Sequence, residues 1–166
     1  MRFTTERFGV IEINPDEIYD FPLGIIGFPE YRKYGIHHDE KLSPFKWLQS
    51  LEEPRLCFFV VEPFLIFPNY QIEVKLDGLL ERDLTDKDEL MVLAICTIAS
   101  EFRDSTANLL APLIVNRTRR IAYQVVLEDG KNATKHRLFP ETEADPSTVE
   151  VENAASEGNV AKASSM

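Results

Sequence analysis

The stretch RLCFFVVEPFLIFPNY (Arg55 to Tyr70) joins a run of apolar and β-branched residues to a segment bounded by prolines. Its first half has the composition of a β-strand, in which successive side chains point to opposite faces. We therefore predict a strand over RLCFFVVE with an apolar surface on each side. One of these surfaces carries Cys57, Phe59 and Val61, and the other carries Phe58 and Val60.

The second half, EPFLIFPNY (62–70), places four large apolar residues between Pro63 and Pro68. In an extended chain one face cannot absorb all four side chains, and the prolines prevent complete strand pairing. Two alternatives remain: the segment plugs one end of a barrel, or part of it stays on the surface and joins an apolar patch with FPLGIIGF (21–28). We expect some of it to remain exposed as a docking patch, because contiguous exposed apolar area usually marks a binding site.

Short apolar segments separated by turn residues continue on both sides of this stretch. The helical crossovers of roughly 10 to 15 residues that a parallel sheet needs are missing, and the one helix signal is short, in DGLLERDL and the capping-like TDKD after it. The fold class is therefore mostly β, a small antiparallel β-barrel-like single domain with a few short helices and a disordered acidic C-terminal tail. The other predicted strands are GVIEIN (9–14), IYDFP (18–22), KWLQSL (46–51), YQIEVKL (70–76), LMVLAICTIA (90–99), NLLAPLIVN (108–116, bent at Pro112) and IAYQVVLED (121–129).

Length and composition indicate one soluble domain followed by a tail. The chain of 166 residues is long enough to bury its own core, and 44% hydrophobic with 28% charged residues is typical of a globular protein. No run approaches the ~20 apolar residues of a membrane span, and the N-terminus lacks the layout of a secretion signal, which favours a cytoplasmic protein. We place a barrel domain at 1–139 and a disordered tail at 140–166, where hydrophobicity is low and aromatic residues are absent.

The net charge of −10 is unevenly distributed. Six acids and one lysine between Glu141 and Met166 leave −5 on the tail, while 22 acids and 17 bases leave −5 on the rest. A nonspecific nucleic-acid binder needs net positive charge, so this balance disfavours that class. A basic protein partner is favoured instead.

No residue set typical of catalysis, cofactor binding or metal binding emerges, so we predict that the protein is not an enzyme. Adjacent side chains of an extended HHDE (37–40) would point to opposite faces, which favours a solvated turn over a metal site. His136 lies between two basic residues, which disfavour a protonated ring, and no carboxylate stands at a known spacing to make it a base. Cys57 and Cys96 sit in apolar runs and are expected to be buried, reduced thiols.

Basic residues do gather near the C-terminal end of the predicted barrel. A direct RNA-binding surface on a β-sheet is one interpretation, since Tyr123 lies nearby and could stack on bases. A solvated hairpin end is the alternative, and the net charge of −10 favours it. The residues concerned are Arg117, Arg119, Arg120, Lys131, Lys135 and Arg137.

Four motifs, in this order and at similar separations, resemble the bacterial flagellar assembly factor family, FliW: DFPLGIIGFPEY, SPFKWLQSLEEPRLCFFVVEPFLIFPNY, STANLLAPLIVN and RIAYQVVLEDGKNATKHRLF. The resemblance covers residues 1–139. It implies a small β-barrel-like protein without enzymatic activity that binds flagellin in the cytoplasm. When flagellin is secreted, the freed factor would bind the translational regulator CsrA away from its RNA site and relieve repression of flagellin translation allosterically. It would be a monomer on its own, with no direct contact to nucleic acid or membrane.

The resemblance also implies which residues contact partners, although Trp47 is more often a core anchor than a contact. The chain departs from the family pattern in GKNATKHRLF, where Tyr-Ser more often precedes the basic pair, and in its long acidic tail. The residues carried over by matching motifs are Phe21, Pro22, Gly24, Gly27, Phe28, Trp47, Leu48, Gln49, Ser50, Pro63, Phe64, Phe67, Pro68, Tyr70, Asn108, Pro112 and Asn116.

Overall fold

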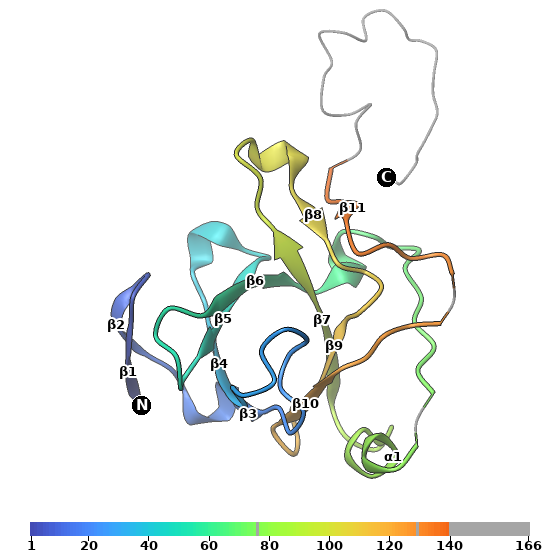
Figure 1. Ribbon diagram of the computed structural model, residues 1–166, viewed down its shortest axis with the longest axis horizontal. Coiled ribbons are helices and arrows are strands. Elements are labelled where there is room, and N and C mark those ends of the chain that lie inside the picture. The colour runs from blue at the N-terminus through green and yellow to red at the C-terminus, as the bar shows by residue number, and fades with distance from the viewer. Residues whose placement is uncertain (76, 129, 140–166) are drawn as a thin grey trace, which may run out of the picture.

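The computed structural model describes residues 1–75, 77–128 and 130–139. Within them, seven strands close into a ring in the order β3-β4-β5-β6-β7-β9-β10, as Figure 1 shows. The predicted small, mostly β barrel is confirmed. One pairing differs from the expected antiparallel succession, because β10 and β3 are parallel where they close the ring. The strands are β3 (Ile18–Asp20), β4 (Lys33–His37), β5 (Lys46–Ser50), β6 (Cys57–Val61), β7 (Leu90–Thr97), β9 (Leu113–Asn116) and β10 (Ile121–Gln124).

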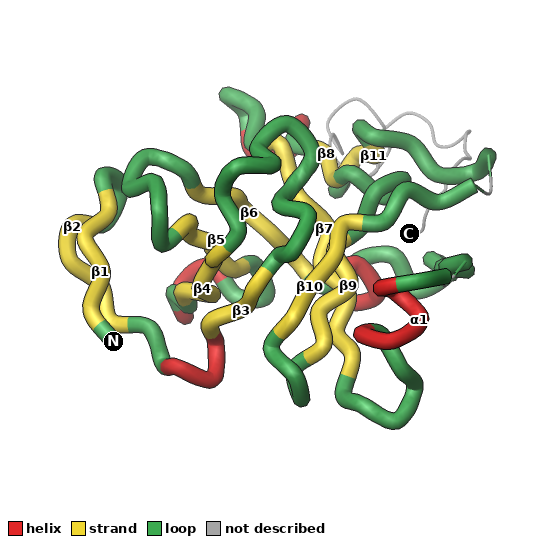
Figure 2. The backbone as a smooth tube through the Cα atoms, turned by 60° about the horizontal axis from the view of Figure 1, so that its bottom comes forward, coloured by secondary structure: helices red, strands yellow, loops and turns green. Residues whose placement is uncertain are grey.

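Shorter elements surround the ring. β8 (Thr106–Ala107) and β11 (His136–Arg137) extend the sheet beside β7, and β1 (Arg2–Thr5) pairs with β2 (Gly9–Glu12) as a separate hairpin. This hairpin and α1 (Leu79–Asp83) lie at opposite sides of the molecule (Figure 2). Four single-turn 3-10 helices complete the described part of the chain: η1 (Pro15–Glu17), η2 (Glu40–Leu42), η3 (Pro63–Leu65) and η4 (Phe102–Asp104).

The strands alternate between two hydrophobic clusters, as the apolar faces of residues 55–62 predicted. Val60 and the half-buried Phe58 belong to one cluster, and Phe59 and Val61 belong to the other. The first, called the interior cluster, draws residues from all seven ring strands, which can meet only inside the barrel: Tyr19, Tyr34, Ile36, Leu48, Val60, Met91, Leu93, Leu113, Val115 and Ala122. The second, called the outer cluster, includes Trp47, Phe59, Val61, Tyr70, Ala94, Cys96, Ala107, Leu109, Leu127 and Leu138.

The segment between β3 and β4 plugs one end of the barrel. Phe21 and Ile25 join the interior cluster, and Figure 1 shows this loop lying across the opening of the ring. The plug requires a glycine at position 24, where φ is 68° and an added Cβ would lie 2.7 Å from the Cα of Pro29. The plug is therefore formed by FPLGIIGF. EPFLIFPNY, which was expected to plug the barrel in one of the two alternatives, does not form it.

EPFLIFPNY itself packs on the outside of the barrel and is not extended. Pro63–Leu65 forms the 3-10 turn η3, and the Pro63 carbonyl accepts hydrogen bonds from the amides of Ile66 (3.1 Å) and Phe67 (2.7 Å). Ile66 and Phe67 then pack against the outer cluster, whereas FPLGIIGF packs against the interior one. A proline at the first position favours this turn, because its fixed φ suits a helical start.

Several strand predictions were wrong in their extent. Residues 70–75 form no strand, although their side chains alternate in burial as YQIEVKL predicted. NLLAPLIVN is not two strand pieces, since β9 begins only at Leu113, and β10 ends at Gln124. The sequence predicted which side chains are buried. Strand pairing also requires the free edge of a neighbouring strand, and the local sequence pattern does not show whether one is available.

Cys57 and Cys96 are both free thiols, as predicted. Cys96 is buried, and burial raises its pKa to about 12, so it is inert as a nucleophile. Cys57 is only half-buried, which corrects the prediction of full burial. The predicted tail, 140–166, lies outside the described residues, and the boundary at 139 stays a prediction.

Candidate functional site

The outside of the barrel exposes large apolar side chains on η3. Phe64 is 44% exposed and Leu65 is 62% exposed, while Ile66 and Phe67 are half-buried against the outer cluster. Successive side chains of a 3-10 turn point about 120° apart, so one turn cannot bury all of them against a single surface. The expectation that part of EPFLIFPNY stays on the surface is confirmed.

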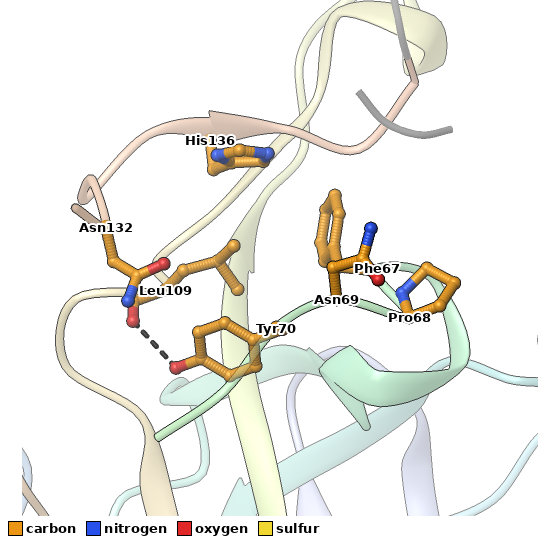
Figure 3. Close-up of a pocket in the computed structure, with 7 residues that line it drawn as sticks. All are labelled: Phe67, Pro68, Asn69, Tyr70, Leu109, Asn132 and His136. Atoms are coloured by element: carbon orange, nitrogen blue, oxygen red, sulfur yellow. Dashed lines mark hydrogen bonds between the residues drawn. The ribbon is translucent and has the colours of Figure 1, made fainter. Parts of the chain in front are cut away.

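A pocket of about 200 Å³ opens beside this turn (Figure 3). Phe67 and Tyr70 form one wall, and His136 of β11 forms the other. The Tyr70 hydroxyl donates to the Leu109 carbonyl at 2.7 Å, which fixes the tyrosine ring. The His136 ring meets Phe67 edge to face, with centroids 4.8 Å apart. The complete lining is Phe67, Pro68, Asn69, Tyr70, Leu109, Asn132 and His136.

His136 is suited to packing rather than to acid–base chemistry. Burial lowers its pKa, so the ring is neutral at pH 7. The cause is burial, rather than the neighbouring basic residues on which the sequence-based expectation rested. The other residues that line the pocket carry no carboxylate to orient the ring. The pocket can therefore hold an apolar group but offers no acid–base pair for a reaction.

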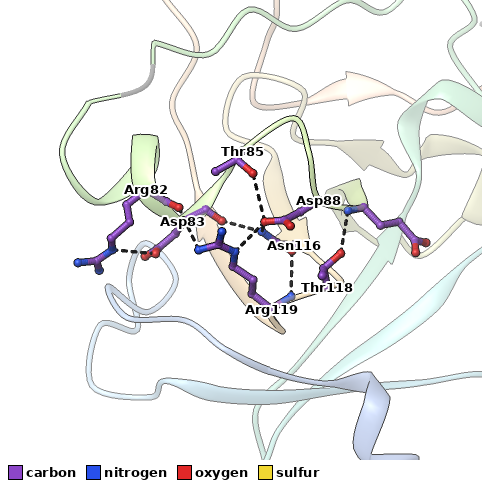
Figure 4. Close-up of polar contacts among 8 residues, drawn as sticks. Arg82, Asp83, Thr85, Asp88, Asn116, Thr118 and Arg119 are labelled. Carbon is purple, nitrogen blue, oxygen red and sulfur yellow. Dashed lines mark hydrogen bonds and ion pairs between the residues drawn. The ribbon is translucent and has the colours of Figure 1, made fainter.

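A buried polar network ties the β9–β10 turn to the loop after α1 (Figure 4). The Asn116 amide donates to the Asp83 carbonyl at 2.8 Å and to the Asp88 carboxylate at 2.9 Å. Its Oδ1 accepts from the Arg119 amide at 3.0 Å. Asp83 also accepts from the Tyr123 hydroxyl at 2.6 Å. Asn116, predicted as a partner contact, is thus a fully buried organiser of two loops.

The carboxylates of this network make stability depend on pH. The hydrogen bond from Arg82, and then the one from Tyr123, hold the pKa of Asp83 below its usual range. The hydrogen bond from Asn116 does the same for Asp88. A depressed folded-state pKa stabilises the fold above the ordinary value of about 4, and this contribution is lost as the pH falls through the folded-state value.

We expect the free energy of unfolding to fall as the pH drops below about 4, and to fall less steeply in Asp83→Asn. Urea denaturation at a series of pH values between 7 and 3 measures both slopes. The slope is the readout, because the substitution also changes the stability at pH 7. Equal slopes in the variant and the parent protein would show that Asp83 does not contribute.

The predicted RNA surface is not a free basic patch. Its four arginines each lie within ion-pair distance of a carboxylate, so much of their charge is already balanced. The pairs are Arg117 with Glu17 (3.3 Å), Arg119 with Asp88 (2.7 Å), Arg120 with Asp16 (2.9 Å) and Arg137 with Asp104 (3.2 Å).

HHDE (37–40) also differs from the expectation. His37 ends β4 and packs on the Phe8 ring with centroids 4.8 Å apart, so the solvated turn begins only at His38. His38 lies 3.2 Å from the Glu17 carboxylate. Among the described residues, no group of three or more histidine, cysteine or acidic side chains is arranged to hold a metal ion.

The structure divides the predicted partner-contact residues into two groups. The buried group supports the fold: Phe21, Gly24, Trp47, Leu48, Gln49, Ser50, Pro63, Tyr70, Pro112 and Asn116. The exposed or half-buried group remains available to a partner: Pro22, Gly27, Phe28, Phe64, Phe67, Pro68 and Asn108.

The pocket brings together only part of the predicted set. Phe67, Pro68 and Tyr70 line it, whereas Phe21 and Asn116 lie in the plug and in the polar network. Sequence reasoning missed Asn69, Leu109, Asn132 and the packing role of His136. Asn69 belongs to EPFLIFPNY, but no local sequence pattern indicates that residues 69, 109 and 136 lie close together in the fold.

Fold and site together define a small β-barrel protein that exposes large apolar side chains beside a pocket. Within the described ranges, no helix is long and apolar enough to cross a membrane. The family model described as FliW protein matches residues 2–138. The chain therefore belongs to the FliW family, whose named relatives are flagellar assembly factors.

Relatives of known name agree over nearly the whole chain. The flagellar assembly factor FliW of Moorella thermoacetica is 37% identical over 152 residues, which cover 90% of this chain and 95% of that relative. The one from Geobacillus kaustophilus is 40% identical over 141 residues, covering 85% and 97%. A crystal structure of the flagellar assembly factor FliW superposes with a TM-score of 0.74 at 39% identity, covering 85% of this chain and 99% of that one.

Proposed function

We propose that this protein is a cytoplasmic regulatory factor that works by switching partners. It binds flagellin and, when flagellin is exported, it binds the translational regulator CsrA and relieves repression of flagellin translation allosterically. The protein is a monomer on its own and catalyses no reaction. The observation that carries this proposal is a closed barrel of the FliW family that exposes Phe64 and Leu65 beside an apolar pocket.

Charge and apolar surface have separate roles in this proposal. The net charge of −10 attracts a basic RNA-binding partner and raises the association rate more than the affinity. The exposed apolar side chains supply affinity when a partner covers them. Two partners compete for one factor if their bound states exclude each other, and linkage makes this exclusion reciprocal.

Direct RNA binding is the weaker candidate. Its surface comprises Arg117, Arg119, Arg120, Lys131 and Arg137, and all four arginines lie within ion-pair distance of acidic side chains. An RNA phosphate would have to displace these carboxylates, in a molecule that carries a net negative charge.

Size-exclusion chromatography with multi-angle light scattering tests the proposal. The purified protein is expected to co-elute with flagellin and, in a separate run, with CsrA. Adding flagellin to the CsrA complex is expected to release CsrA. Co-elution with neither partner would contradict the proposal. Salt-sensitive binding of RNA by the protein alone, measured by filter binding, would favour the RNA-binding alternative instead.

A further inference from the structure

The ring of seven strands closes through a weak junction, between β3 and β10. Within the described ranges this junction has a single residue pair in register, Ile121 with Asp20, whereas every other neighbouring pair of ring strands has three or four. The Asp20 amide donates to the Arg120 carbonyl at 3.0 Å. The junction lies at the bottom of the ring in Figure 1. Few backbone hydrogen bonds therefore resist separation of β3 from β10.

The backbone at the junction is strained. Arg120 has a φ of 56°, and among the residues that the structure describes it is the one non-glycine residue with a positive φ. Residues with a Cβ seldom adopt this conformation, because the Cβ crowds the backbone, and surrounding contacts must hold them in it. Arg120 also supplies the carbonyl that accepts from Asp20. The residue that closes the ring is thus one that relaxes when the junction opens.

Ion pairs on the outside reinforce the junction. Glu17 of η1 lies 3.3 Å from Arg117, and Asp16 of η1 lies 2.9 Å from Arg120, so both pairs connect η1 to the β9–β10 turn across the junction. Asp16 and the two arginines are exposed. Ion pairs of exposed side chains stabilise a fold only slightly, and salt screens them. These two pairs, called the latch, therefore form a weak fastening that depends on salt.

The plug is tied to β10 by the side chain of Gln124. The Ile26 amide donates to Oε1 of Gln124 at 2.8 Å, and Nε2 of Gln124 donates to the Ala111 carbonyl at 3.0 Å. Each strand of the junction also has a better-paired neighbour, since β3 has three residue pairs with β4 and β10 has four with β9. Separation of β3 from β10 therefore leaves the rest of the ring paired.

We propose that the ring opens locally at the β3–β10 junction, without global unfolding, and that the latch sets how often it opens. The closed form is the major one, because Tyr19 of β3 and Ala122 of β10 pack in the interior cluster. In the open form the facing edges of β3 and β10 lack a partner strand. A closed barrel has no such edge, and an unpaired edge is a place where another strand can add. The junction thus gives the barrel a second state with a different surface.

Hydrogen exchange of single amides, followed by NMR on the protein alone, tests the local opening. After correction for intrinsic rates, the Asp20 amide is expected to exchange at least about tenfold faster than the amides that bond within the β5–β6 ladder. Raising the NaCl concentration from about 0.05 M to about 1 M is expected to speed the exchange of Asp20 relative to those amides, because salt screens the latch. Equal exchange at Asp20 and in the β5–β6 ladder would overturn the proposal.

Removing one ion pair of the latch gives a second readout. Glu17→Gln is expected to speed the exchange of the Asp20 amide about two- to fivefold. Glu89→Gln is the matched control, because Glu89 lies 3.5 Å from the same Arg117 but precedes β7, which does not border the junction. Glu17 also lies 3.2 Å from His38, so His38→Gln is a second control. Both controls should leave the exchange of Asp20 nearly unchanged.

The exchange pattern in Glu17→Gln distinguishes local opening from a general loss of stability. Faster exchange at Asp20, with unchanged exchange in the β5–β6 ladder and an unchanged urea midpoint, supports opening at the junction. An equal increase at Asp20 and in the β5–β6 ladder overturns it, because both would then exchange through global unfolding. An effect of Glu89→Gln as large as that of Glu17→Gln overturns the role of the latch.

Discussion

Replacing Trp47 by alanine is expected to lower the free energy of unfolding by about 3–5 kcal/mol, the usual cost of truncating a buried large aromatic side chain. Trp47 is 7% exposed, and its ring packs on Phe59 and Phe8 with centroids 4.8 and 5.4 Å away. The Arg7 guanidinium lies 4.8 Å above the ring. The side chain therefore joins the β1–β2 hairpin to β5 and β6. Urea denaturation measures the loss.

Phe64→Ala is the matched control, because it removes an aromatic ring that is 44% exposed. We expect it to change the free energy of unfolding by less than about 1 kcal/mol. A similar loss in both variants would contradict the structural role of Trp47. Trp47→Ala also reduces binding simply because it unfolds the protein. A folding measurement must therefore accompany any binding result for this residue.

Asn116→Leu is expected to lower the free energy of unfolding by about 2–4 kcal/mol, because a buried amide with three hydrogen bonds is replaced by an apolar group. The buried Asp83 carbonyl and the part-buried Arg119 amide would lose their partner. The loop after α1 would then separate from the β9–β10 turn. Denaturation by urea measures the loss, and amide hydrogen exchange locates the loosened segment.

Thr118→Val serves as the comparison for this second prediction. The Thr118 hydroxyl accepts one hydrogen bond, from the exposed Glu89 amide at 2.9 Å, and water can replace it. We expect a cost below about 1 kcal/mol. If Asn116→Leu costs no more than Thr118→Val, the network in Figure 4 contributes little to stability, and Asn116 is not needed to organise the two loops.

Much of the barrel was predictable because its strands carry local patterns. KWLQSL, RLCFFVVE and LMVLAICTIA all contain strands, and the two apolar faces of residues 57–61 meet two different clusters. Burial follows the period of the strand, which the sequence displays directly. YQIEVKL shows the limit of this reasoning, since its alternation predicted burial correctly but pairing incorrectly.

The candidate site was less predictable, because its residues come from distant parts of the chain. The ion pair of Arg117 with Glu17 joins positions 100 residues apart, and it changes a basic cluster into a balanced surface. The pocket similarly joins Phe67 to Leu109 and His136. The four ordered motifs indicated the family, but they did not separate buried residues such as Asn116 from exposed ones such as Phe64.

The sequence by itself determined the class of fold, the alternating apolar faces and the family, because each of these follows from patterns within short segments of the chain. Only the tertiary structure decided which apolar segment enters the barrel. FPLGIIGF fills the opening because Gly24 allows a turn too tight for any Cβ, whereas the 3-10 turn at Pro63 leaves Phe64 and Leu65 outside. That choice depends on how the two segments pack against the closed barrel, and no local pattern contains it.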